Sequence, residues 1–240
     1  MPARRAPADR RRDPARDARG AATAVLVPLK SFGQAKSRLS PVLGPERRSE
    51  LARTMASRVI AAAGGHTVLV VCDDDQVSSF ASDSGAGVVL TPGLGLNAAL
   101  RRATDEASEL GHDRVVIAAG DLPFAHDLGS LWTMAGGRGG DEDVLIVPDR
   151  HLRGTNVLSF AVSARPELCF GPDSYHLHLQ AAEAAGLEVL VVSDERLGWD
   201  VDTPEDLSPP AHLGEFPPGR PARHSRGALP HDPLPGSRAG

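Results

Sequence analysis

Basic side chains gather in one short segment near residue 30. Lys30 and Lys36 are the only lysines among 26 basic residues, and Arg38 follows them closely. Gly33 stands between the lysines and would let the backbone approach a ligand. Cations in such a loop could hold a triphosphate and neutralise a leaving pyrophosphate. The spacing of a Walker A loop is absent from this segment, so we predict a phosphate-binding loop of another kind, with a plain solvated loop as the alternative.

Two sets of carboxylates could hold a metal ion. Asp121 follows the apolar run 115–119, and Asp200 and Asp202 stand two positions apart in a second set. Alternate residues of an extended chain point the same way, so the second pair could share a ligand. Mg²⁺ usually takes one or two carboxylates and completes its shell with phosphate oxygens and water. We therefore predict that Asp121 and one of Asp200 and Asp202 bind Mg²⁺, with turn or capping roles as the structural alternative.

A glycine loop lies between an apolar run and a helical stretch. The pattern Gly93-x-Gly95-x-x-Ala98 matches the relaxed dinucleotide-binding fingerprint. Pro92 precedes the loop, however, and strand–helix units already come before it, so a dinucleotide cofactor is the weaker interpretation. We predict a nucleotide-binding loop of another type, in which Gly95 allows close approach and Asn97 hydrogen-bonds a base or ribose.

Two hydroxyl groups and a glycine later in the chain could bind an anion. Thr155 and Ser174 offer hydroxyls, and Gly171 offers an unobstructed backbone N–H. Ser174 stands at the expected start of a helix, where free N–H groups and the dipole favour an anion, a role compatible with a plain N-cap. We predict a phosphate or carboxylate site here. His176 and His178 follow on the same helix, but their spacing puts them on different faces and argues against a metal pair.

These residues need secondary-structure elements that bring them together. Apolar runs predict strands at 24–29, 68–71, 88–90, 114–118, 144–147, 157–160 and 189–192. Helical patterns cover 46–63, 76–84, 97–110, 127–135 and 174–185, and residues 30–40 form a loop. Alternation of strand and helix predicts an α/β fold of three αβα layers around a mainly parallel, mixed sheet. Ligands of such folds bind beyond the carboxyl ends of the strands, where the candidate residues stand.

The composition of the two chain ends predicts one domain between disordered tails. Residues 1–20 hold seven Arg and three Asp without a branched aliphatic side chain, and 208–240 is rich in Pro, Gly, His and Arg. The expected domain is 21–207. The whole chain has a net charge of −5 although both tails are net basic, so the domain is acidic. An acidic domain argues against a nucleic-acid partner.

The sequence also bounds the environment of the protein. We find neither a membrane-spanning apolar run nor a signal-peptide pattern, so we expect no membrane partner. Cys72 and Cys169 lie far apart without metal-site spacing and are expected to be reduced thiols of a cytoplasmic protein. The sequence leaves the oligomeric state open, a homodimer included.

Taken together, the motifs resemble the 2-phospho-L-lactate/phosphoenolpyruvate guanylyltransferases of deazaflavin coenzyme F-420 biosynthesis. The resemblance extends over about residues 25–207 and rests on six motifs in the family's order: LVPLKSFGQAKSRLS, GLGLNAAL, AAGDLP, PDRHLRGTNVLSF, FGPDSYHLH and DVDTPEDL. The family often has a small residue where Leu152 stands, so the loop before Gly154 is expected to differ in shape.

The resemblance implies a nucleotidyltransferase-like fold and a Mg²⁺-dependent reaction. That reaction joins GTP to 2-phospho-L-lactate or phosphoenolpyruvate and releases diphosphate. Carried onto this chain, it implies that Lys30, Lys36, Arg38 and Asp121 are catalytic. It further implies nucleotide contacts from Lys30, Gly95 and Asn97, metal ligation by Asp121 and Asp202, and binding of the phosphorylated acid by Thr155, Gly171 and Ser174.

Two other functions remain open from sequence. One is a related cytidylyl- or guanylyltransferase with a different phosphorylated acceptor, against which the motifs after Gly154 argue. The other is a non-catalytic nucleotide-binding protein, against which the intact acidic motifs argue. The residues do not decide between phosphoenolpyruvate and 2-phospho-L-lactate. An Arg-rich, Lys-poor composition is typical of a GC-rich, actinobacterium-like genome, for which the resemblance implies phosphoenolpyruvate.

Overall fold

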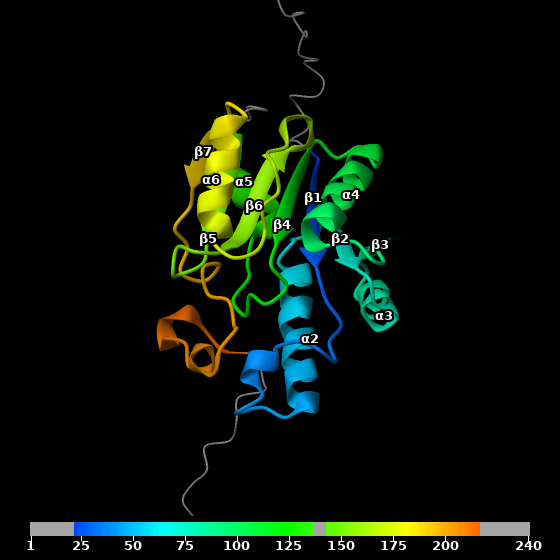
Figure 1. Cartoon of the computed structure of the whole chain (residues 1–240), viewed down its shortest axis with the longest axis vertical. Helices are drawn as coiled ribbons and strands as arrows, with labels where there is room; N and C mark the ends of the chain where they lie inside the picture. Colours follow the sequence, from blue (N-terminus) through cyan, green and yellow to red (C-terminus); the bar gives the residue numbers. More distant parts are fainter. Residues whose placement is uncertain (1–21, 137–142, 217–240) are drawn as a thin grey trace, which may run out of the picture.

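The computed structural model describes residues 22–136 and 143–216 of the chain (Figure 1). The tail predicted over 1–20 lies outside them, as does the predicted C-terminal tail from residue 217 onward. Residues 208–216, by contrast, pack against the core. A short 3₁₀ helix, η5 (Ala211–Leu213), buries Leu213, and the ring of Phe216 lies 6.1 Å from that of Phe124. The folded part thus extends past the boundary predicted at Leu207.

A single mixed sheet forms the centre of the described residues. Its strands are β1 (Thr23–Pro28), β2 (Thr67–Cys72), β3 (Gly87–Leu90), β4 (Arg114–Ala118), β5 (Asp143–Pro148), β6 (Thr155–Ala161) and β7 (Glu188–Val191). Their order is β3-β2-β1-β4-β6-β5-β7, and every pair is parallel except those of β6 with β4 and β5. The mainly parallel, mixed sheet predicted from the apolar runs is confirmed.

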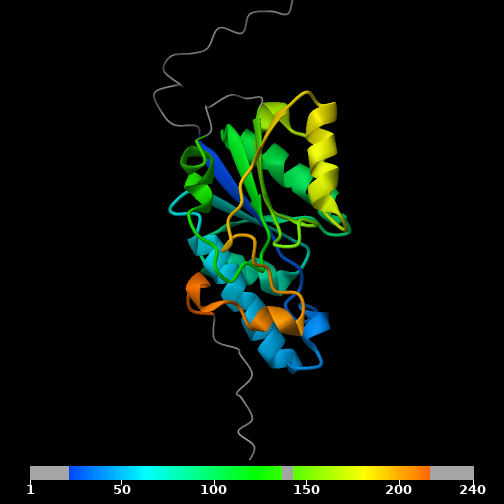
Figure 2. The ribbon, with the colours of Figure 1, turned by 90° about the vertical axis from the view of Figure 1, so that its left-hand side faces the viewer.

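Helices cover both faces of this sheet and complete the three predicted layers (Figures 1 and 2). On one face α2 (Pro45–Ala61), α3 (Asp75–Asp83) and α5 (Leu131–Met134) bury one hydrophobic cluster. On the other face α4 (Leu96–Glu109) and α6 (Ser174–Ala184) bury a second cluster. Strands whose side chains meet helices on both sides must be apolar throughout, which is why they read as continuous runs.

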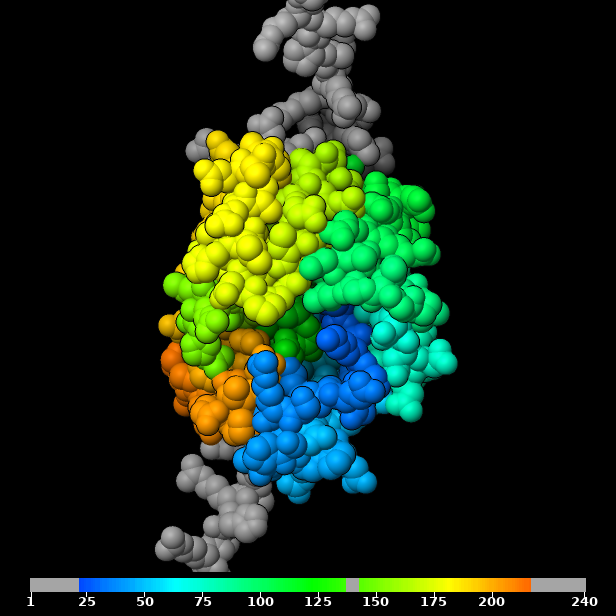
Figure 3. All heavy atoms as spheres, viewed as in Figure 1, coloured from blue at the N-terminus to red at the C-terminus, as the bar shows by residue number. Residues whose placement is uncertain are grey.

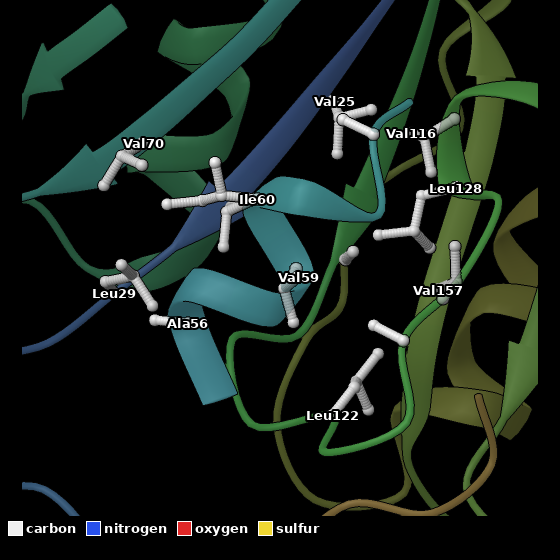
Figure 4. Packing of buried hydrophobic residues seen from close by; sticks show 14 of the residues in the cluster. Val25, Leu29, Ala56, Val59, Ile60, Val70, Val116, Leu122, Leu128 and Val157 are labelled. Carbon is white, nitrogen blue, oxygen red and sulfur yellow. The ribbon is translucent and has the colours of Figure 1, made fainter. Parts of the chain in front are cut away.

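Helix α2 illustrates how the sequence specifies these layers. Pro45 is its first residue, where a missing N–H costs nothing. Leu51, Met55 and Val59 recur at helical spacing and are fully buried. Figure 4 shows Val59 and Ile60 packed in one cluster with side chains of the sheet such as Val25.

Two predicted segments differ from the structure. The helix predicted over 127–135 is reduced to the 3₁₀ helix η2 (Leu128–Ser130) and the four-residue α5. Asp127 takes a left-handed backbone with φ of 45°, and a Cβ on Gly129 would meet the carbonyl oxygen of Ala63 at 2.4 Å. This close packing against the turn after α2 prevents a regular helix. The loop predicted over 30–40 contains a 3₁₀ helix, η1 (Ser37–Leu39).

The sheet topology brings the candidate residues to one edge. β2 and β4 flank β1 on opposite sides, and the crevice beyond the carboxyl ends at such a switch point is the usual ligand site. Because β6 is antiparallel to β4, its first residues lie at this same edge, with Val157 opposite Ala118. Residues that follow β1 and β4 therefore lie close to the residue that begins β6, while those that follow β2 and β3 continue the same edge in the other direction.

The helices and the cysteines of the described residues bear on the expected surroundings of the protein. None of their helices has the length and apolar character needed to cross a membrane. Cys72 and Cys169 are both free thiols, the first buried and the second partly buried.

Candidate active site

A cavity of about 500 Å³ opens at the carboxyl edge of the sheet. Pockets for small molecules typically measure about 300–1,000 Å³, so a nucleotide-sized ligand fits. Figure 3 shows it as a hollow bordered by the blue residues after β1, the green start of α4 and the orange residues near 200. The predicted site residues that line it are Lys30, Lys36, Gly95, Asp121 and Thr155.

The Lys36 ammonium lies between two of the predicted metal ligands. Its Nζ donates a hydrogen bond to Oδ2 of Asp121 and another, of 3.1 Å, to Oδ1 of Asp202. Burial of the side chain, only 11 % exposed, opposes its charge, but the two carboxylates outweigh this effect and raise the pKa of Lys36. The lysine is therefore a fixed cation, and it brings two carboxylates 81 positions apart in the chain to one point.

The backbone of Lys36 is strained in a way that fits a functional position. Its φ of 55° lies in the left-handed region, which costs a non-glycine residue roughly 1–2 kcal/mol. Such strain is often found where a side chain must be held for function. The cation Arg38 in the following 3₁₀ helix lies 3.5 Å from Oδ2 of Asp202, but it is 74 % exposed. Lys30 is exposed beyond the end of β1 and lines the cavity.

Asp121 is placed by a close approach of two strand ends. A Cβ on Gly120 would come within 2.3 Å of the Leu29 side chain and 3.3 Å of the Pro28 carbonyl oxygen. Only glycine therefore lets the chain leave β4 so near the exit of β1. Leu122 is fully buried and anchors the chain on the far side of Asp121. The carboxylate is left at the mouth of the cavity, 26 % exposed.

A buried ion pair holds the loop that carries Asp200 and Asp202. Oδ2 of Asp206 accepts the backbone N–H of Asp202 at 2.7 Å and of Thr203 at 2.6 Å, as part of a capping box. Its Oδ1 pairs with Nη2 of Arg150. Burial alone would raise the pKa of Asp206, but these N–H groups and the guanidinium together lower it. Thr203 is the N-cap of the short 3₁₀ helix η4 (Pro204–Leu207).

Arg150 fixes the same loop through three further contacts. Its guanidinium stacks over the ring of Trp199 at 4.2 Å, and its Nη1 donates to the carbonyl oxygen of Asp200 at 3.1 Å. Its backbone N–H donates to the carbonyl oxygen of Gly198 at 2.9 Å. The sequence does not predict a functional role for Arg150 or Asp206, because the two residues that pair are 56 positions apart in the chain.

The carboxylates fit a divalent cation. Burial first, and the negative charge of Asp121 second, raise the pKa of Asp200 to about 6. Asp121 and Asp202 converge closely enough to touch one ammonium. Over 22–136 and 143–216, no three metal-ligating side chains surround one point. Two carboxylates with phosphate oxygens and water are nevertheless a common Mg²⁺ shell.

The predicted anion site is a hydrogen-bonded group behind the cavity. Ser174 is the first residue of α6 rather than its N-cap, which is Asp173. Its Oγ accepts the N–H of Thr155 at 2.9 Å, and Oγ1 of Thr155 lies 2.9 Å from Nδ1 of His178. Nε2 of His178 accepts the N–H of Cys169 at 3.0 Å, so Nδ1 carries the proton and donates to Thr155. Both hydroxyls accept a protein N–H, which leaves their own protons for an anion.

Gly171 lies in the loop before α6, and Asn97 is the second residue of α4. Gly171 is exposed, with a φ of 139° that favours glycine. The Asn97 amide donates to the carbonyl oxygen of Phe170 at 3.1 Å and accepts its N–H at 2.8 Å. Asn97 therefore positions the loop that carries Gly171, and a direct contact with nucleotide stays a prediction. Gly95 is the N-cap of α4 and lines the cavity.

The loop before Gly154 shows why a small residue suits position 152. Leu152 has a φ of 56° and is 55 % exposed, so glycine, which has no Cβ, would take this backbone more easily. Asp149 folds the loop by accepting the N–H groups of His151, Arg153 and Gly154 within 3.0 Å.

We expect buried His178 to make the protein less stable in mild acid. Burial lowers the pKa of His178 from 6.5 to about 4. The unfolded chain therefore gains a proton between these values that the folded chain does not. The stabilising effect of keeping His178 neutral is complete above pH 6.5. The free energy of unfolding then falls by about 3 kcal/mol as the pH drops to 4. Urea unfolding at several pH values measures this slope.

Two variants test the assignment to His178. His178→Gln should flatten the slope between pH 6.5 and 4, whatever its effect on stability at neutral pH. His176→Gln is the matched control, because His176 is exposed and stands on the same helix. An unchanged slope in the His178 variant would assign the acid sensitivity to other groups.

Comparison with known proteins agrees with the geometry. A family model described as guanylyl transferase CofC like matches residues 23–212. The chain is 34 % identical over 191 residues to the phosphoenolpyruvate guanylyltransferase of Sphaerobacter thermophilus, covering 77 % of this chain and 90 % of that one. It is 35 % identical over 190 residues to the 2-phospho-L-lactate guanylyltransferase of Methanothermobacter thermautotrophicus, covering 77 % and 82 %.

A solved structure supports the fold. A nucleotidyl transferase from Methanothermobacter thermautotrophicus superposes with a TM-score of 0.56 at 15 % identity, covering 78 % of this chain and 94 % of that one. Identity at this level supports a shared nucleotidyltransferase-like fold alone. The family model and the sequence relatives reach further, since they extend over most of the chain. The chain therefore belongs to the CofC-like guanylyl transferase family.

Proposed function

We propose that this protein transfers the guanylyl group of GTP to the phosphate of phosphoenolpyruvate and releases diphosphate, as a step of coenzyme F-420 biosynthesis. The observation that carries the proposal is the meeting of Lys36, Asp121 and Asp202 at the mouth of a nucleotide-sized cavity. Family membership supports it, because relatives are named phosphoenolpyruvate or 2-phospho-L-lactate guanylyltransferases. The reaction pairs two polyanions, which explains fixed cations inside an acidic domain.

The chemistry needs no covalent intermediate with the protein. An oxygen of the acceptor phosphate is already ionised and attacks the α-phosphorus of GTP in line. A phosphorus–oxygen bond forms to the acceptor while the bond between the α-phosphorus and the oxygen that bridges to the β-phosphate breaks. The electron pair leaves with diphosphate. The task of the protein is to position the two anions and to stabilise the charge that spreads in the transition state.

The acceptor is proposed to bind at the start of β6 and α6. The free protons of the Thr155 and Ser174 hydroxyls can donate to its carboxylate or phosphate oxygens, together with the N–H of Gly171. Thr155 lines the cavity, and its hydrogen bond from His178 fixes the direction of that donation. Both hydroxyls are buried, so an anion bound to them would be shielded from water.

The triphosphate is proposed to lie along Lys30 and Lys36, with Arg38 at the rim. Lys30 faces the cavity and makes no ion pair with a described residue, so its charge is available to the β- and γ-phosphates. Lys36 is buried and charged, and it can donate to a phosphate oxygen at the reacting centre. Gly95 at the start of α4 offers close approach on the nucleoside side.

Mg²⁺ is the proposed cofactor, held by Asp121 and Asp202, with Asp200 beside them. When bound, the ion would neutralise phosphate charge and orient the triphosphate. Burial and, second, the charge of Asp121 raise the pKa of Asp200, and a dication would favour the ionised form of all three carboxylates.

Small molecules are the expected partners of the protein. The free thiols of Cys72 and Cys169 support the expected cytoplasmic location.

A diphosphate-release assay tests the proposal. Purified protein receives GTP, Mg²⁺ and either phosphoenolpyruvate or 2-phospho-L-lactate, and diphosphate is followed because the product can be unstable. We expect release that depends on phosphoenolpyruvate. Release with 2-phospho-L-lactate alone would move the acceptor to that of the Methanothermobacter relative. Folded protein that binds GTP and releases nothing with either acid would contradict the function.

A further inference from the structure

The cavity continues along the sheet beyond the proposed phosphate site. Besides Asp121 after β4 and Lys30 after β1, its lining includes Asp73 after β2 and Thr91 after β3. These strands are neighbours in the order β4, β1, β2, β3, so the cavity follows the sheet edge in one direction. The proposed acceptor lies on the opposite side of Asp121, at the start of β6. The nucleoside must therefore occupy the end of the cavity beyond β2 and β3.

One carboxylate is free at that end. Two acidic side chains line the cavity, and Asp121 is engaged by Lys36, which leaves Asp73. Asp73 is exposed, and no hydrogen bond or ion pair joins its side chain to another residue of the described part of the chain. The next aspartates have other places: Asp74 accepts the N–H of Val77 at 3.0 Å as the N-cap of α3, and Asp75 is the first residue of that helix.

The apolar walls of the same cavity suit a flat aromatic ligand. Leu94 and Leu96 line the cavity although they are 45 % and 39 % exposed. Large apolar side chains that remain exposed in a cavity are commonly covered by a ligand. A purine ring packed on apolar walls keeps its polar edge for hydrogen bonds, and Asp73 is the carboxylate of this cavity that is not engaged by Lys36.

The chemistry of guanine matches a carboxylate at this position. Guanine presents two adjacent donors, N1–H and the 2-amino group, and the two oxygens of one carboxylate can accept both. Adenine presents an unprotonated N1 at that edge, which a carboxylate repels. Xanthine keeps N1–H but has an oxygen in place of the amino group. We infer that Asp73 is a specificity-determining residue that selects guanine by accepting its N1–H and 2-amino hydrogens, an inference that rests on the proposed use of GTP.

A change of base preference tests this role. Asp73→Asn keeps the size of the side chain and replaces one acceptor oxygen with an NH₂ donor, which matches the edge of xanthine. The ratio of kcat/KM for GTP to kcat/KM for XTP is expected to fall at least about 100-fold in the variant. The dissociation constants of GTP and XTP, measured with Mg²⁺ and without acceptor, should shift in the same direction.

Asp75→Asn is the matched control, because it makes the same change two positions away at a residue that does not line the cavity. It should leave the GTP to XTP ratio as in the wild type. Equal losses for both nucleotides in Asp73→Asn would place Asp73 at ribose or phosphate and overturn the inference, as would an unchanged ratio. Binding without acceptor does not need turnover. A wild-type protein that releases no diphosphate would thus contradict the proposed function alone, while the two dissociation constants still test Asp73.

Discussion

Asp121→Asn is expected to lower diphosphate release at least about 100-fold while the protein stays folded. The substitution keeps the shape of the side chain and removes its charge. That charge holds Lys36 in place and is proposed to ligate Mg²⁺, so the variant loses both at the reacting centre. Turnover is measured with GTP, phosphoenolpyruvate and Mg²⁺, and folding is followed by circular dichroism and urea unfolding.

The stability of this variant should remain close to that of the wild type. Asp121 is partly exposed, and Lys36 keeps its hydrogen bond to Asp202. Asp127→Asn is a matched control, since Asp127 lies in the same loop, does not line the cavity and has a left-handed backbone that Asn tolerates. Near-normal turnover of Asp121→Asn at saturating Mg²⁺ would refute the metal role of Asp121.

The edge at which the site forms could be predicted from sequence, because the strands are buried on both faces. Runs such as Val115 to Ala118 are apolar at every position, which excludes an alternating half-exposed strand. Once the strands are placed, parallel pairing brings the residues after β1 and β4 together. The location of Thr155 at this edge is harder to predict, because no local sequence signal gives the antiparallel direction of β6. Only the residue type of Thr155 and the family resemblance indicate a binding role for it.

Contacts inside the site could not be predicted, because they join residues far apart in the chain. Nothing in the first loop indicates that Lys36 reaches both Asp121 and Asp202. Nothing near Asn97 indicates that its amide pairs with the backbone of Phe170, 73 positions away. A helical sequence pattern can also predict a helix that tertiary packing prevents. This happens in the segment 127–135, where Gly129 packs against Ala63.

The ion pair of Arg150 and Asp206 is expected to govern both stability and metal use. Arg150→Met removes the guanidinium that pairs with Oδ1 of Asp206, a carboxylate that is only 4 % exposed. Because Arg150 is itself 24 % exposed and Oδ2 of Asp206 keeps two backbone N–H groups, the expected loss is about 2 kcal/mol of unfolding free energy, between the values for exposed and fully buried pairs. The loop that carries Asp202 should loosen, so the Mg²⁺ concentration for half-maximal turnover should rise about 10- to 100-fold.

Control variants separate this effect from the loss of any arginine. Arg153→Met should change stability by less than about 1 kcal/mol, because Arg153 and its partner Asp173 are both exposed. Arg150→Lys keeps the charge but loses the fork and the flat stack on Trp199, so it should rescue only part of the stability. The double variant with Asp206→Asn should be less destabilised than the sum of the single changes, by about 1–3 kcal/mol. Additive losses, or an unchanged Mg²⁺ requirement, would mean that the pair stabilises the fold without positioning the carboxylates of the site.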